Sequence, residues 1–259
     1  MKEVGSYVYK EYKAATYGMI YWSHGDGWVP FPLNNTRWIG QDVSDGDKRM
    51  NISQFNEVLS VAPHFDFLMF DACFMQSVEV AYELRETADY IIASPTEIPG
   101  PGAPYQVVMP TIFSKSDNSA IAIAASYYDY YEAKYDEGKN NANSNWTAGV
   151  SMSVIKTSEL NEFARITEVV FNSYFHNPVN KANIMCYDRR SSQYYYDLDG
   201  YIKELTGKDA QYDLWKIAFN KVQHYYKTTS RNFSQTGGMF SMKGSAGIST
   251  FIPQGTGIL

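Results

Sequence analysis

The chain has 259 residues, of which 44% are hydrophobic and 19% charged, and its formal net charge is −6. This balance excludes a fibrous or disordered protein, and the negative charge argues against nucleic acid or an anionic membrane as the main partner. No apolar run approaches the roughly 20 residues that a membrane span needs, so we expect no membrane partner.

The first part of the chain predicts a helix, a strand and a long loop. Residues 3–15 are rich in Lys, Glu and Tyr and predict a short helix that ends near Gly18, and the run YGMIYWS that follows predicts a buried strand. Residues 24–51 are dense in Gly, Pro, Asn and Asp, so we expect a loop, and its length indicates a functional or processed segment. A helix should follow over 53–62, with Ser53 as its N-cap.

The next stretch alternates strand and helix patterns. FDFLMFDAC, residues 65–73, predicts a second buried strand, and it runs directly into a helical pattern over 75–88. DYIIASP, residues 89–95, predicts a third strand, followed by a loop over 96–105. Residues 119–135 predict a further helix.

The second half continues the alternation. We expect a strand over 147–156 and a strong helix over 158–175 with Ser158 as its N-cap. Two further helices are predicted over 197–207 and 214–226, and a late strand over AGISTFIP. Strands that alternate with helices predict an α/β fold, with a mainly parallel sheet covered by helices on both faces.

Two reactive side chains follow neighbouring predicted strands. In open parallel sheets, ligands gather at the carboxyl ends of the strands, and His24 and Cys73 each lie just beyond such an end. A lone histidine is more often structural, and a cysteine beside an apolar strand is more often buried and inert. Together they fit the nucleophile and base of a cysteine hydrolase, with the N–H groups of Gly25 and Cys73 as an oxyanion hole. We expect a helix N-terminus after Cys73 to lower the pKa of its thiol.

Asp71 precedes the cysteine by two residues, so its side chain should face the same side of the strand. A carboxylate there would favour a cationic Arg or Lys side chain in the substrate. A helix-capping or otherwise hydrogen-bonded carboxylate is an equal alternative. Cys186, the second cysteine, is interpreted as structural, and the two cysteines can form one disulfide at most.

Several of these segments resemble the clostripain family of cysteine peptidases, within the caspase-like group. The resemblance is carried by YWSHGDGW, by the block from FDACFMQSVEVAYEL to PGPGAPY, and by YYDLDGYIKEL and GISTFIP. It implies a caspase-like three-layer sandwich in a single domain over residues 1–259. Because relatives have a strand before the first helix and more chain after the last strand, we expect a chain truncated at both ends. The resemblance also implies a secreted or cell-envelope bacterial protein, with no signal peptide present in this chain.

The resemblance further implies a cysteine endopeptidase that cleaves protein or peptide substrates after Arg or Lys, with a Cys73–His24 dyad. Asp71 would form the pocket for the basic side chain, with Glu97 as a second carboxylate. Many relatives carry an acidic residue where Pro95 or Thr96 stands here, so the chain departs from the family pattern at that point.

Family members are often activated by self-cleavage in the loop after the histidine strand. Arg37, Lys48 and Arg49 lie in that loop, and Arg37 is the preferred site by its place after the histidine, whereas solvated loop charge is the alternative for all three. We expect no resident metal or cofactor. Calcium, which some relatives use, is left open, because DVSDGDKRMN holds three aspartates but lacks the spacing of an EF-hand.

Two other functions are weighed against this one. The chain could be a catalytically silent caspase-like module that binds a protein partner, although intact His24 and Cys73 speak against it. It could also be a caspase-like peptidase of other specificity, for example one that cleaves after Asn.

Overall fold

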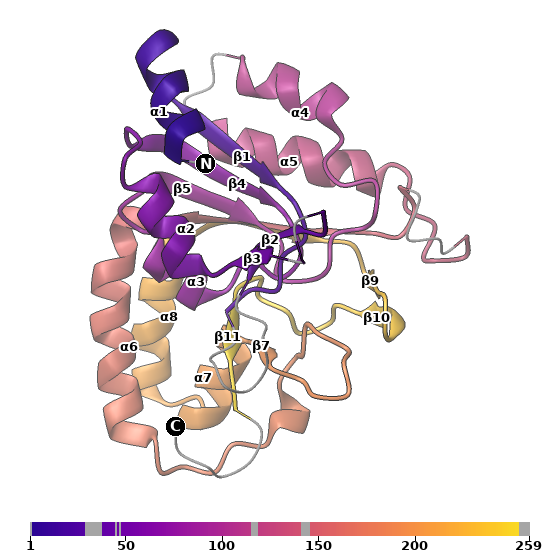
Figure 1. The fold of residues 1–259 in the computed structure, drawn as a ribbon. Helices are drawn as coiled ribbons and strands as arrows, with labels where there is room; N and C mark the ends of the chain where they lie inside the picture. The colour runs from indigo at the N-terminus through magenta and orange to yellow at the C-terminus, as the bar shows by residue number, and fades with distance from the viewer. Residues whose placement is uncertain are drawn as a thin grey trace.

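The computed structural model describes residues 2–28, 38–44, 46, 48–114, 119–140 and 146–253. Within them, one central sheet has the strand order β1-β4-β5-β6-β8 (Figure 1). Its strands are β1 (Gly18–Trp22), β4 (Phe65–Asp71), β5 (Ala88–Ala93), β6 (Ser151–Lys156) and β8 (Gln223–Thr228). β1, β4 and β5 are parallel neighbours, whereas β6 pairs antiparallel with both β5 and β8. All the described strands of this sheet except β6 therefore run in the same direction.

Side chains of β4 alternate between two cores, and this alternation sets the layers of the fold. Leu68 and Phe70 belong to one core, and Phe67 and Met69 to the other. The first core is covered by α2 (Ile52–Leu59), α3 (Val78–Glu83), α6 (Leu160–Tyr174), α7 (Leu198–Thr206) and α8 (Ala210–Val222). The second core is covered by α4 (Tyr105–Ile112) and α5 (Ser119–Glu132). Figure 1 shows the two groups of helices on opposite faces of the sheet, which confirms the predicted three-layer α/β fold.

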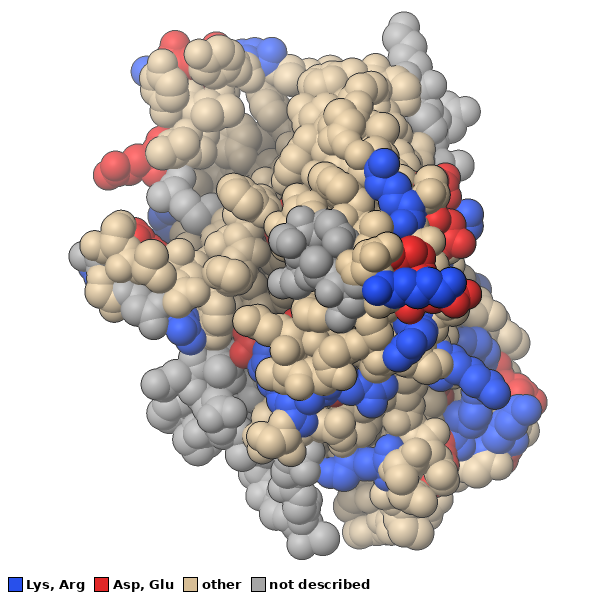
Figure 2. Space-filling view, turned by 90° about the vertical axis from the view of Figure 1, so that its right-hand side faces the viewer, with Lys and Arg blue, Asp and Glu red and all other residues tan. Residues whose placement is uncertain are grey.

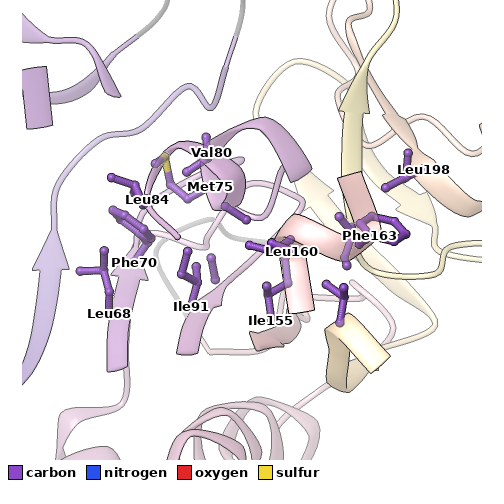
Figure 3. Close-up of a cluster of buried hydrophobic side chains, with 14 of the residues drawn as sticks. Leu68, Phe70, Met75, Val80, Leu84, Ile91, Ile155, Leu160, Phe163 and Leu198 are labelled. Carbon is purple, nitrogen blue, oxygen red and sulfur yellow. The ribbon is translucent and has the colours of Figure 1, made fainter. Parts of the chain in front are cut away.

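The larger core also fixes the chain that follows β4. Figure 3 shows Leu68 and Phe70 on the sheet, with Met75 and Val80 of the next turn and helix packed beside them. All four side chains are fully buried, and burial of such a side chain contributes about 1.5–3 kcal/mol. Met75 lies two residues after Cys73, so the packing that stabilises the sheet also holds the turn that carries the cysteine.

Shorter elements complete the described part of the chain. Three two-stranded ribbons pair β2 (Ile39–Asp42) with β3 (Lys48–Met50), β7 (Tyr195–Asp197) with β11 (Ser249–Phe251), and β9 (Arg231–Ser234) with β10 (Gly238–Ser241). The N-terminal helix α1 (Lys2–Glu11) packs Tyr9 against Phe65 at the start of β4. Short 3-10 turns span Thr157–Glu159 and Lys181–Asn183. None of the described helices is long and apolar enough to cross a membrane.

The N-terminal helix and the first three predicted strands are confirmed, although α1 ends at Glu11, before the predicted end near Gly18. The predicted loop over 24–51 is partly wrong. The segment from Ile39 to Met50 contains the paired strands β2 and β3, which return to the turn after β1. The Gly40 N–H donates to the His24 carbonyl (2.9 Å), and the Asp26 N–H donates to the Trp38 carbonyl (3.0 Å). The composition of the segment did not reveal these two short strands, because Gly and Asp residues flank them and favour a loop.

Both predicted helix N-caps are wrong. α2 is capped by Asn51, whose side chain accepts from the Gln54 N–H (2.8 Å) while the Gln54 side chain accepts from the Asn51 N–H (3.0 Å). This reciprocal pair satisfies two backbone donors, which Ser53 cannot do because it is already the second residue of the helix. Ser158 lies in the 3-10 turn ahead of α6, and the residue at the N-cap is Glu159, which makes no side-chain cap bond.

The C-terminal part of the predicted helix over 214–226 is also wrong, because α8 ends at Val222 and Gln223 begins β8. Pairing of β8 with β6 adds the outermost described strand to the sheet, and these tertiary hydrogen bonds override the helical pattern. α4 was not predicted, and it starts at Tyr105, the last residue of the predicted loop over 96–105.

Candidate active site

The carboxyl ends of β1 and β4 bring His24 and Cys73 together. Trp22 at the end of β1 pairs with Asp71 at the end of β4, so the residues that follow both strands lie at one edge of the sheet. His24 and Cys73 each follow their strand by two residues, and both line one cavity of about 440 Å³. The His24 side chain is exposed and Cys73 is partly buried. A larger cavity, of about 520 Å³ and bordered by α3 and α6, contains neither of them.

The arrows of β1, β4 and β5 point toward the side of the molecule that Figure 2 shows. On this side, uncharged residues make up most of the upper half, and Lys and Arg gather in the lower half. The overall charge of the chain is negative, but this side carries a group of basic residues in its lower half.

The thiol of Cys73 is held in its neutral form. Burial raises the pKa of Cys73 to about 12, and the Ile98 N–H, which donates to its sulfur (3.3 Å), offsets only part of that effect. The predicted lowering of this pKa by a helix N-terminus is therefore wrong. α3 begins only at Val78, with Ser77 as its N-cap, so Cys73 lies on the turn before the helix and not at its end. A base must remove the thiol proton as the sulfur reacts.

Gly25 is a glycine because the two turns touch. A Cβ at this position would lie 2.9 Å from the Cys73 carbonyl oxygen, which is closer than real Cβ atoms come, and 3.0 Å from the Ala72 Cβ, which is also tight. The bridge to residues 38–40 uses the carbonyl of His24 and the N–H of Asp26. In an antiparallel bridge of this kind the N–H of the middle residue points away from the partner strand. The Gly25 N–H is thus turned away from β2.

Asp71 lines the same cavity at the end of β4 and is 2% exposed. Its carboxylate accepts from the Ala103 N–H (2.8 Å), the Tyr127 hydroxyl (3.0 Å) and the Tyr105 hydroxyl (3.1 Å). Burial raises the pKa of Asp71, and these three donors partly oppose the rise. A Cβ on Gly102, whose φ is +68°, would lie 2.8 Å from an Asp71 carboxylate oxygen. Of the two readings left open, the structure shows a hydrogen-bonded carboxylate that also faces the cavity.

Glu97 faces elsewhere. Its carboxylate accepts from the Ser234 hydroxyl (2.7 Å) and from the Gln235 N–H (2.8 Å), so it ties the loop after β5 to the turn between β9 and β10. Of the two predicted pocket carboxylates, the described residues of the cavity include Asp71 but not Glu97.

The predicted cleavage loop is described only in part. Arg37 lies outside the described residues, while Lys48 and Arg49 belong to β3. The Arg49 guanidinium lies over the Trp38 ring, 4.3 Å from its centroid. Within the described residues, no group of three or more His, Cys, Asp or Glu side chains is arranged to hold a metal ion. Two of the three aspartates considered as calcium ligands, Asp45 and Asp47, lie outside the described residues. Calcium binding at this loop is therefore left open.

Sequence reasoning missed one contact at the site. Asp26, two residues after His24, is 3% exposed and forms an ion pair with Arg190. Burial raises the pKa of Asp26, and the hydrogen bond and charge of Arg190 lower it. An aspartate between two glycines in HGDG signals a tight turn, but a partner 164 residues away leaves no local signal.

The chain is similar to several proteins of known structure. No curated protein sequence matches the chain. A structure of a secreted C11 cysteine protease from Bacteroides thetaiotaomicron, in complex with an irreversible peptide inhibitor, shares 45% identity and a TM-score of 0.87, over 98% of this chain and 70% of that one. A B. fragilis cysteine protease shares 49% identity and a TM-score of 0.80, over 84% of this chain and 89% of that one.

A third structure is that of an inactive zymogen C11 protease from Parabacteroides distasonis, with 31% identity and a TM-score of 0.77, over 97% of this chain and 68% of that one. The model of the clostripain family matches residues 1–256. The chain therefore belongs to the clostripain family of cysteine peptidases, with the caspase-like fold and the cysteine-type endopeptidase activity of that family.

Proposed function

We propose that this endopeptidase cleaves peptide bonds after Lys or Arg, with Cys73 as the nucleophile and His24 as the base. One observation carries the proposal: His24, Cys73 and Asp71 line the same cavity. The first two supply a nucleophile and a proton acceptor, and the third supplies a negative charge in reach of a substrate side chain.

The raised pKa of Cys73 decides how the reaction starts. Because the resting thiol is neutral, His24 takes the proton as the sulfur attacks the scissile carbonyl carbon. The backbone N–H groups of Gly25 and Cys73 then hold the oxygen that becomes negative. His24 returns the proton to the leaving amine, and a water molecule releases the acyl group from the sulfur.

Asp71 selects the substrate side chain. Its charge lies in a cavity walled by Ile98, Pro99 and Gly102, which fit the aliphatic stem of a Lys or Arg. The hydrogen bonds from Tyr105 and Tyr127 fix the carboxylate, so little reorganisation is needed when the cation arrives.

A peptide electrophile with Lys next to its reactive group tests this function. We expect it to label the protein at least about 100-fold faster than the same electrophile with norleucine at that position, because norleucine keeps the stem and lacks the charge. Peptide mapping by mass spectrometry should place the label on Cys73, and Cys186→Ser should leave labelling intact. A label on Cys186 would contradict the assignment of the nucleophile. Equal labelling rates, or preference for Asn, would instead support the alternative specificity.

We also propose that the enzyme matures by cleaving itself after Arg37. One relative is described as an inactive zymogen, and Arg37 lies in the chain that connects the His24 turn to β2. The active protein should therefore separate into two fragments under denaturing conditions, whereas Arg37→Ala and Cys73→Ala proteins should stay intact by mass spectrometry. Lys48→Ala serves as the control and should be cut normally. Normal cutting of Arg37→Ala would rule out this site.

We place the enzyme outside the cytoplasm, because the Bacteroides thetaiotaomicron relative is described as secreted.

A further inference from the structure

A third segment of the chain joins the turn of His24 to the turn of Cys73. Arg190 forms an ion pair with Asp26, which follows His24 by two residues. Five residues further on, the Tyr195 hydroxyl donates to the backbone carbonyl of the same Asp26. The Asp26 side chain is almost fully buried and Tyr195 is fully buried, whereas the Arg190 side chain is 33% exposed and reaches Asp26 from the edge of the interior.

The same two residues hold the turn of Cys73. Phe74, directly after the nucleophile, has φ +60°, a left-handed conformation that costs energy in a bulky residue and persists only where its surroundings enforce it. Its ring stacks on Tyr195, with centroids 5.1 Å apart and planes 13° apart. The Arg190 guanidinium lies 5.1 Å from the centroid of that ring. Arg190 and Tyr195 thus contact Phe74 as well as Asp26.

The turn after His24 and the turn after Cys73 also contact each other directly. A Cβ on Gly27, whose φ is +57°, would lie 2.6 Å from the Phe74 carbonyl oxygen and 3.0 Å from the Tyr195 ring. The three segments therefore meet without room for another heavy atom at this point. A shift of any one of them is passed to the other two.

The segment that carries Arg190 is itself well anchored. The buried Asp188 carboxylate accepts from the N–H groups of Tyr194 and Tyr195, each at 3.2 Å, and from the Cys186 thiol at 3.1 Å. Tyr195 is also the first residue of β7, which pairs with β11. Arg190 and Tyr195 therefore project from a fixed loop and strand.

We infer that Arg190 is a positioning residue of this peptidase. Through Asp26 and Phe74 it sets the distance between the His24 imidazole and the Cys73 sulfur, and Tyr195 shares the task. The inference rests on the proposed Cys73–His24 dyad. Arg190 should affect the chemical step and not substrate binding. The proposed binding residue, Asp71, precedes Cys73 in the sequence and is held by Tyr105 of α4 and Tyr127 of α5, which Arg190 does not hold.

The test compares Arg190→Met with Arg189→Met. The neighbouring Arg189 lies over the Phe240 ring, 4.4 Å from its centroid, and offers the same substitution away from the two turns. We expect Arg190→Met to lower kcat by about 10- to 100-fold, the size of effect that a small misplacement of catalytic groups causes, while KM for a Lys peptide changes by less than about threefold. Arg189→Met should change both by less than about threefold.

A double-mutant cycle with Asp26→Asn separates positioning from a general loss of stability. If the ion pair is the working unit, the double variant should be no slower than the slower single variant, within about threefold, whereas independent effects would multiply. Arg190→Lys keeps the charge without the planar fork and should recover part of kcat. Should Arg190→Met fail to fold, the Asp26→Asn and Arg190→Lys proteins still carry the comparison.

Two outcomes would overturn the inference: an Arg190→Met protein with wild-type kcat, or effects of Arg190→Met and Asp26→Asn that multiply. Both differ from a failure of the proposed dyad. That failure would appear as activity retained in Cys73→Ala, whatever the Arg190 variants do.

Discussion

Cys73→Ala is expected to lower kcat/KM for a Lys-containing peptide by at least about 10⁴-fold, because in the proposed mechanism the sulfur forms the covalent intermediate, and no second thiol lines the described cavity. His24→Ala should cause a loss of similar size. The double variant should lose little more than either single one, since a nucleophile and its base act as a unit. A fluorogenic peptide assay on matched concentrations of folded protein measures all three.

Cys186→Ser is the matched control for this experiment. Both cysteines are free thiols, but Cys186 donates to Asp188 in the interior and takes no part in the cavity of Cys73. The serine keeps a donor for Asp188, so activity should stay within about threefold of wild type. Activity of Cys73→Ala above a hundredth of wild type would remove Cys73 from the mechanism.

The second large effect is expected for Asp71→Asn. The substitution keeps the shape and most hydrogen bonds of the side chain but removes the charge that would meet Lys or Arg. Loss of one partner of a buried charge pair costs about 2–4 kcal/mol, so kcat/KM for a Lys peptide should fall by about 30- to 1,000-fold. The kcat/KM for the norleucine peptide should change far less. The deciding measurement is therefore the ratio of kcat/KM for the Lys peptide to kcat/KM for the norleucine peptide.

The pH dependence of the same ratio gives an independent check. Because burial raises the pKa of Asp71, its carboxylate takes up a proton at a higher pH than an exposed aspartate does. As pH falls through that value the charge is lost, and the preference for Lys over norleucine should fall with it. Above that value the preference should be constant, and in Asp71→Asn it should be small at every pH.

Asp66→Asn supplies the control, since it makes the same change at the other end of β4. Its preference for Lys should match that of wild type. A full Lys preference in Asp71→Asn would remove Asp71 from the pocket, and a large loss in Glu97→Gln would restore the second predicted carboxylate to it.

Much of the site was predictable because strand ends follow simple rules. Short apolar runs marked β1 and β4, and their parallel pairing alone brings the residues after Trp22 and Asp71 to one edge. The two-residue period of a strand then links Asp71 to the side of Cys73. These inferences use local pattern and one topological rule, and the structure agrees with both.

What failed depends on contacts between distant segments. The pKa of Cys73 follows from burial and from where α3 begins, and a strand-then-helix pattern does not reveal the intervening turn. β8 was not predicted because its residues continue the helical pattern of α8, and only pairing with β6 makes them a strand. The partner of Asp26 lies in a loop whose sequence, DRRSSQ, resembles any polar surface turn.

The neutral state of the Cys73 thiol has a consequence for durability. Peroxide and other mild oxidants attack the thiolate, so a cysteine with a pKa of about 12 presents almost none of the reactive form at neutral pH. A preformed thiolate would be a faster nucleophile but would also be oxidised to sulfenic acid while no substrate is bound. In the proposed mechanism, burial beside Ile98 therefore protects the resting sulfur, which becomes reactive when His24 takes its proton.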